Sequence, residues 1–142
     1  MNRIASILAT VVAVASFGAS TVRAADAERW GVWETSLSGP RTGNPYRDVT
    51  FSAVFTLGDR KIDVPGFYDG EGTYKIRFMP PAAGEWRYKT QSNVPELSGK
   101  TGSLTAGPPT AKNHGPVQVF KTFYLRYADG TPYHQFGTTC YA

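Results

Sequence analysis

Alternation of apolar and more polar side chains is the feature that most restricts how this chain can fold. A period of two residues places successive side chains on opposite faces of a β-strand, so that one face packs in a core and the other meets water. No segment after residue 24 has the apolar spacing of an amphipathic helix. Alternating runs occur at residues 49–55, 74–78, 86–90 and 123–127, with a shorter run at 117–119 and a first strand expected over 30–37.

Turn residues separate these runs. Gly58, Gly70 and Gly130 each neighbour an aspartate, a pairing typical of tight turns because glycine adopts the positive φ that such turns need. Pro80 and Pro81 cannot donate a backbone hydrogen bond, so a strand must end before them. Short strands at intervals of about 8–12 residues predict an all-β fold, an antiparallel β-sandwich rather than alternating strands and helices.

The N-terminus reads as a signal peptide over residues 1–24. Arg3 supplies the positive charge, residues 4–19 form the apolar stretch, and residues 22–24 place small or aliphatic side chains at a cleavage site after Ala24. A transmembrane helix would need about 20 strongly apolar residues, and Ser16 and Ser20 interrupt the run. We therefore expect an exported protein, secreted or periplasmic, without a membrane partner after cleavage.

Charge and cysteine content argue against two further classes of protein, those that bind nucleic acid and those held together by disulfides. The formal charge of +4 falls by two when Arg3 and Arg23 leave with the signal peptide, and no run of basic residues is present. Nucleic acid is therefore not an expected partner. Cys140 is the single cysteine, so no internal disulfide can form and the domain must be held together by packing.

Few residues are candidates for chemistry. Asp69 and Glu71 could be read as a carboxylate pair or as calcium ligands, but they lie in a glycine-rich turn and lack the rest of a calcium loop. His114, His134 and Cys140 lack the close spacing of a zinc site. Motifs for a serine or cysteine nucleophile and phosphate-binding loops are absent. We predict no catalytic residue, no metal ligand and no cofactor.

Two tryptophans are candidates for a contact surface. Trp30 and Trp33 are three residues apart, which on a regular strand directs them to opposite faces. One is then expected in the core, and the other is exposed or covered. An exposed ring could pack against a neighbouring domain or stack on a sugar, and domain packing is the favoured alternative.

Four cations form a second candidate surface. Lys75 and Arg77 share the outer face of one expected strand, and Arg87 and Lys89 share the outer face of the next. If these strands paired as a hairpin, like charges would face one another and destabilise the sheet unless something neutralised them. Carboxylates on neighbouring strands are the simpler solution. An acidic partner, either another domain or an anionic polysaccharide, is the alternative.

Several motifs resemble one known family. They occupy residues 65–80 (Pro-Gly-Phe-Tyr-Asp-Gly-Glu-Gly-Thr-Tyr-Lys-Ile-Arg-Phe-Met-Pro), 84–88, 113–117 and 127–133. The chain from Trp30 onward is similar to the immunoglobulin-like domain-of-unknown-function family 5060. This family precedes (β/α)8 barrels in secreted bacterial glycoside hydrolases and apiosidase-like proteins. The resemblance implies an immunoglobulin-like β-sandwich whose partner is a C-terminal (β/α)8 barrel.

The final residues resemble the first strand of such a barrel. We expect the signal peptide at 1–24, the sandwich at 25–132, and a linker with a truncated first barrel strand at 133–142. A barrel needs about 250 residues and holds its catalytic groups at the ends of later strands, so none is carried over. The expected function is that of a non-catalytic accessory domain of an exported glycoside hydrolase. The alternative is a stand-alone module that binds carbohydrate or matrix.

Overall fold

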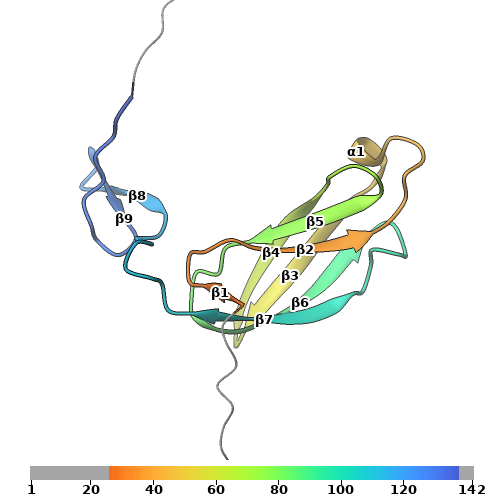
Figure 1. Cartoon of the computed structure of the whole chain (residues 1–142), viewed down its shortest axis with the longest axis horizontal. Coiled ribbons are helices and arrows are strands. Elements are labelled where there is room, and N and C mark those ends of the chain that lie inside the picture. The colour runs from red at the N-terminus through yellow and green to blue at the C-terminus, as the bar shows by residue number, and fades with distance from the viewer. Residues whose placement is uncertain (1–25, 138–142) are drawn as a thin grey trace, which may run out of the picture.

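The computed structural model describes residues 26–137, which are almost entirely β-structure (Figure 1). The all-β class predicted from the alternation is confirmed. The single short helix in this range, α1, connects two strands. The elements are β1 (Ala27–Glu28), β2 (Trp33–Ser38), α1 (Pro45–Asp48), β3 (Phe51–Leu57), β4 (Arg60–Tyr68), β5 (Thr73–Phe78), β6 (Gly84–Ser92), β7 (Thr101–Gly107), β8 (Val117–Phe120) and β9 (Tyr124–Tyr127).

Seven strands form one continuous order of neighbours, β1-β7-β6-β3-β4-β5-β2. The pairs are antiparallel except β1 with β7, which is parallel. β1 and β2 stand at opposite ends of this order, yet only residues 29–32 separate them along the chain. The sheet must therefore curl until its two edges approach each other, and it is nearly closed (Figure 1).

β4 carries the chain from one layer to the other. Residues 60–65 pair with β3, whereas residues 66–68 pair with β5. The change falls at Pro65, which has no N–H to donate, and at Gly66. A Cβ on Gly66 would lie 2.3 Å from Cδ1 of Phe51 and 3.0 Å from the carbonyl oxygen of Lys75. The missing side chain thus lets the Phe51 ring pack directly against the bend.

The core lies between the two layers. Phe78 of β5 contacts Phe55 of β3 and Trp86 of β6, with ring centroids 3.9 and 5.1 Å apart. The indole N–H of Trp86 donates to the carbonyl of Ala82 at 3.0 Å, so its one polar group is satisfied on burial. Alternation in the runs 49–55, 74–78 and 86–90 predicts that one side of each strand faces inward, and the burial agrees: six residues on these sides are buried, and Tyr88 is half-buried against them. The six are Phe51, Phe55, Tyr74, Ile76, Phe78 and Trp86.

Two expectations about the strands are wrong. The strand expected over 30–37 begins only at Trp33, because Trp30 takes a positive φ of 65° and its N–H donates to the carbonyl of Pro80. The hairpin considered for residues 74–78 and 86–90 does not form. β5 pairs with β2 and β4, β6 pairs with β3 and β7, and residues 79–83 cross between the layers. Alternation indicates which side chains share a face but not which strands are neighbours.

The C-terminal hairpin forms a sheet of its own. β8 and β9 pair antiparallel with each other and stand apart from the seven-stranded sheet (Figure 1). Beyond β9, the N–H of Tyr133 donates to the carbonyl of Leu125. The signal peptide expected at 1–24 and the residues from Thr138 onward, including Cys140, lie outside the described residues. Within residues 26–137 no helix has the length and apolar character that a membrane crossing requires.

Candidate functional site

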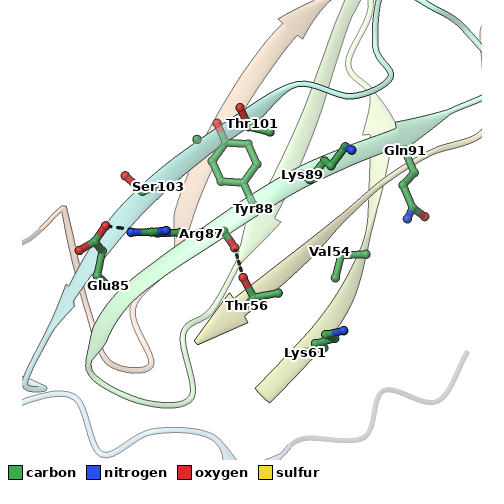
Figure 2. A pocket seen from close by; sticks show the side chains of 11 residues that line it. Val54, Thr56, Lys61, Glu85, Arg87, Tyr88, Lys89, Gln91, Thr101 and Ser103 are labelled. Atoms are coloured by element: carbon green, nitrogen blue, oxygen red, sulfur yellow. Dashed lines mark hydrogen bonds and ion pairs between the residues drawn. The ribbon is translucent and has the colours of Figure 1, made fainter. Parts of the chain in front are cut away.

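A shallow groove of about 890 Å³ runs across the outer face of β3, β6 and β7, with Lys61 of β4 also in its lining (Figure 2). The strand register builds it in rows, because Arg87 lies opposite both Thr56 and Ser103, and Lys89 lies between Val54 and Thr101. The hydroxyl of Thr56 donates to the carbonyl of Arg87 at 3.3 Å. The groove is lined by Val54, Thr56, Lys61, Glu85, Arg87, Tyr88, Lys89, Gln91, Thr101, Gly102 and Ser103.

Positive charge predominates in this groove. Nε of Arg87 lies 3.7 Å from Oε1 of Glu85, and both side chains are largely exposed, so water screens the pair. Among residues 26–137 no carboxylate lies within ion-pair distance of Lys61 or Lys89. The ring of Tyr88 is half-buried and packs toward Trp33. The groove can therefore attract an anion and donate hydrogen bonds to it.

Lys75 and Arg77 lie on a different surface, where Glu34 of β2 faces them both. Oε1 of Glu34 is 3.2 Å from Nζ of Lys75, and Oε2 is 2.5 Å from Nε of Arg77. Hydrogen bonds from Arg77, and to a lesser degree from Lys75, lower the pKa of Glu34. Nζ of Lys75 also lies 2.6 Å from Oδ2 of Asp69. Hydrogen bonds to Asp69, and to a lesser degree to Glu34, raise the pKa of Lys75. These two cations are neutralised within the domain, so the four predicted cations make two surfaces and not one.

The two tryptophans also separate. Trp33 belongs to the core, where its ring contacts Phe55 and Tyr88 with centroids 6.0 and 5.4 Å away. Trp30 lies outside any strand, and the Arg29 guanidinium stacks 3.9 Å from its ring. A Cβ on Gly115, whose φ is +78°, would lie 2.6 Å from the Trp30 ring. Trp30 therefore packs against the segment that leads into the hairpin.

Polar contacts reinforce this junction. The Glu28 carboxylate accepts hydrogen bonds from the N–H of Thr110 and from Nδ2 of Asn113. Both bonds lower the pKa of Glu28, and the bond from Thr110 has the larger effect. We call Glu28, Trp30, Asn113 and Gly115 the latch, because they join the start of the seven-stranded sheet to the segment between β7 and β8. The latch places the hairpin, a role that the sequence did not reveal for Trp30.

The remaining candidate groups form no reactive cluster. Asp69 lies beside Lys75, and Glu71 occupies a turn with a positive φ of 48°. Nδ1 of His114 lies 2.7 Å from Oδ2 of Asp129 and joins the segment before β8 to the segment after β9. A hydrogen bond from the backbone N–H of Thr131, and to a lesser degree one with His114, lowers the pKa of Asp129. The described part of the chain has no group of three or more histidine, cysteine or acidic side chains that could hold a metal ion.

Comparison with known proteins relates this chain to one part of a longer protein. Residues 26–93 match the family model of a domain of unknown function (DUF5060). Among solved structures, the chain is similar to a candidate glycoside hydrolase from Bacteroides vulgatus, with 47% identity and a TM-score of 0.76. The match covers 82% of this chain but 22% of that one, so this chain spans about a fifth of the relative's length. A search of curated proteins found no match.

Proposed function

We propose that this chain is a non-catalytic, immunoglobulin-like accessory domain of an exported bacterial carbohydrate-active enzyme of the glycoside hydrolase type. The observation that carries this proposal is the 47% identity over most of this chain with only 22% of a candidate glycoside hydrolase. At that identity the two segments share more than a common architecture, and the rest of the relative is available for catalysis. The signal-peptide pattern at 1–24 supports export.

The chemistry of the described surface fits a supporting role. Hydrolysis of a glycosidic bond ordinarily requires two carboxylates flanking the bound sugar at about 5–10 Å. Asp69 is engaged with Lys75, and Glu85 in the groove is paired with Arg87. Such a domain supports its enzyme by packing against the catalytic part, and a (β/α)8 barrel of the apiosidase-like kind is the partner that we propose.

The direct test is an activity measurement on purified residues 25–142. We expect no turnover above buffer on a panel of aryl glycosides and plant or algal polysaccharides. The relative from Bacteroides vulgatus provides the positive control on the same panel. Reproducible hydrolysis by this chain, lost in Asp69→Ala or Glu71→Ala, would contradict the proposal.

A second function is favoured by the groove. Lys61, Arg87 and Lys89 line it together with four hydroxyl side chains and one amide, a combination suited to an anionic polysaccharide. In this alternative the domain holds its enzyme, or itself, on an acidic matrix. Retention in a gel containing polygalacturonate but not in one containing neutral xylan would support it.

A further inference from the structure

Exposed apolar side chains are concentrated at the C-terminal hairpin. Five of the eight large apolar residues that stand out as exposed in the described chain lie from β8 onward, and the other three are scattered over the sandwich. A concentration of exposed apolar side chains of this kind marks an interaction site. We call these five the hairpin patch: Val117, Val119, Phe123, Tyr124 and Phe136, with exposed fractions of 41, 69, 90, 65 and 94%.

Each face of the hairpin carries apolar side chains. Val117 and Val119 share one face with their cross-strand partners on β9, and on the other face the pair Phe120 and Tyr124 lies beside the polar pair Gln118 and Arg126. Strands with one face in water carry polar residues on that face, so the aromatic pair on the second face favours a cover on that side as well. The sandwich does not supply that cover, because the hairpin stands apart from it (Figure 1).

A hollow beside the hairpin indicates the chemistry of a partner that could cover it. It has a volume of about 620 Å³ and lies next to Phe120, Tyr124 and Arg126. The Arg126 guanidinium stacks 4.3 Å from the Phe120 ring, and its buried Nε has no hydrogen-bond partner in residues 26–137. A buried donor of this kind calls for an acceptor. The surface thus suits an apolar partner that carries a carboxylate or a free carbonyl.

The tip of the hairpin is held in a conformation that presents an aromatic side chain. Lys121 and Thr122 have φ values of 48° and 66°, a region that β-branched residues such as threonine rarely enter. Phe123 follows at the tip and is 90% exposed. Conformations of this kind persist where the surroundings favour them and often occur at binding sites.

We propose that the hairpin patch is the surface on which the catalytic domain of the parent glycoside hydrolase docks. This inference rests on the proposed function and names the interface for it. The latch fixes the hairpin on the sandwich, so the docked domain would take one orientation. The occupant is the part of the longer relative that lies outside the matched 22%, because that part has no counterpart in the described chain.

Hydrogen exchange in a chimera tests the inference. Residues 26–142 replace the matched domain of the Bacteroides vulgatus protein, and the amides of residues 117–127 are compared with those of this chain alone. We expect exchange at least about tenfold slower in the chimera, with β3 unchanged as the folding control. If the chimera does not fold, the same measurement on the aligned residues of the intact relative replaces it.

Matched variants identify the side chains responsible. Val119→Ser and Tyr124→Ser should abolish the added protection. Val32→Ser and Tyr46→Ser change equally exposed residues on the sandwich, 71 and 73% against 69 and 65%, and should preserve it.

Three outcomes would overturn the proposal, each in a different way. Protection that appears around Val32 or Tyr46 instead of the hairpin would remove the docking surface but keep the accessory role. If a folded chimera shows no added protection anywhere in residues 26–137, both the docking surface and the accessory role are contradicted. Hairpin protection that grows with the concentration of this chain alone would assign the surface to a second copy.

Discussion

The rings of Phe55 and Phe78 lie face to face across the core, with centroids 3.9 Å apart and planes 14° from parallel. Phe55 comes from β3 and Phe78 from β5, two strands that are not hydrogen-bonded neighbours. The contact therefore joins the two layers where the backbone does not. Trp33 and Trp86 complete the cluster by meeting these rings edge-on.

The first prediction follows from this contact. Phe78→Ala should lower the free energy of unfolding by about 3–5 kcal/mol, because it leaves a cavity between the layers. Chemical denaturation measures the loss. Met79→Ala is the control, since Met79 is the next residue and is 44% exposed, and it should change stability by less than about 0.5 kcal/mol. Equal losses would mean that the burial of β5 is misassigned.

A second prediction concerns the bend in β4. Gly66→Ala should destabilise the domain by about 1–3 kcal/mol, because the new methyl group would overlap the Phe51 ring. Phe51→Leu in the same chain should recover part of the loss by giving the methyl group room. Thermal unfolding of the single and double variants measures both effects. Strictly additive losses from the two changes would contradict the proposed contact.

The third prediction concerns acid. The pKa of Glu34 lies below its ordinary value of 4.5 in the folded domain, so its stabilising contribution is present above that pH and is lost as the pH falls through the lowered pKa. Glu34→Gln should therefore flatten the fall in melting temperature between about pH 5 and about pH 3. Some acid sensitivity should persist, because Glu28 and Asp129 also have lowered pKa values. Glu96→Gln, in an exposed loop, should leave the wild-type slope; an identical slope in both variants would exclude the Glu34 ion pairs as its source.

The fourth prediction tests the latch. An isolated two-stranded hairpin is only marginally stable in water, so β8 and β9 should depend on their attachment to the seven-stranded sheet. Trp30→Ala should speed hydrogen exchange of their amides while exchange in β3 and β6 stays unchanged. Asn113→Ala should have the same effect, because it removes the bond to Glu28. Unchanged exchange in β8 and β9 would show that the hairpin is stable without the latch.

A fifth prediction addresses the groove. Replacing Lys61, Arg87 and Lys89 together by glutamine should abolish any retention by polygalacturonate, because it removes the cations that line the groove. Lys75→Gln and Arg77→Gln provide the matched control, since these cations are already neutralised by carboxylates. Affinity electrophoresis at low and high salt compares the two sets. Equal retention of both would place the binding elsewhere.

The sequence predicted the faces of the strands better than their neighbours. Alternation identifies Phe51 and Phe55 as inward because the pattern depends on the strand itself. The separation of β5 from β6 depends on residues 79–83 carrying the chain from one layer to the other, which no local pattern encodes. For the same reason Lys75 and Arg77 could not be assigned to Glu34, which lies more than 40 positions earlier.

The candidate site was accessible to sequence reasoning only in part. Arg87 and Lys89 were identified by their shared face, but Thr101 and Ser103 join them through a register that only the folded sheet defines. The apolar residues of β8 and β9 were visible as alternation. Their exposure was not, because it depends on the hairpin standing apart from the seven-stranded sheet. Trp30 was assigned to a strand because its positive φ leaves no signal in the sequence.

The parallel pairing of β1 with β7 has a mechanical consequence. Ala27 and Glu28 lie beside Ala106 and Gly107, so the chain enters along one strand and leaves along its neighbour in the same direction. A tension that pulls the two ends of the domain apart acts along both strands. It loads their connecting bonds in shear, all at once, instead of opening them one after another. The flanking bonds from Asp26 to Thr105 and from Arg29 to Gly107 share that load.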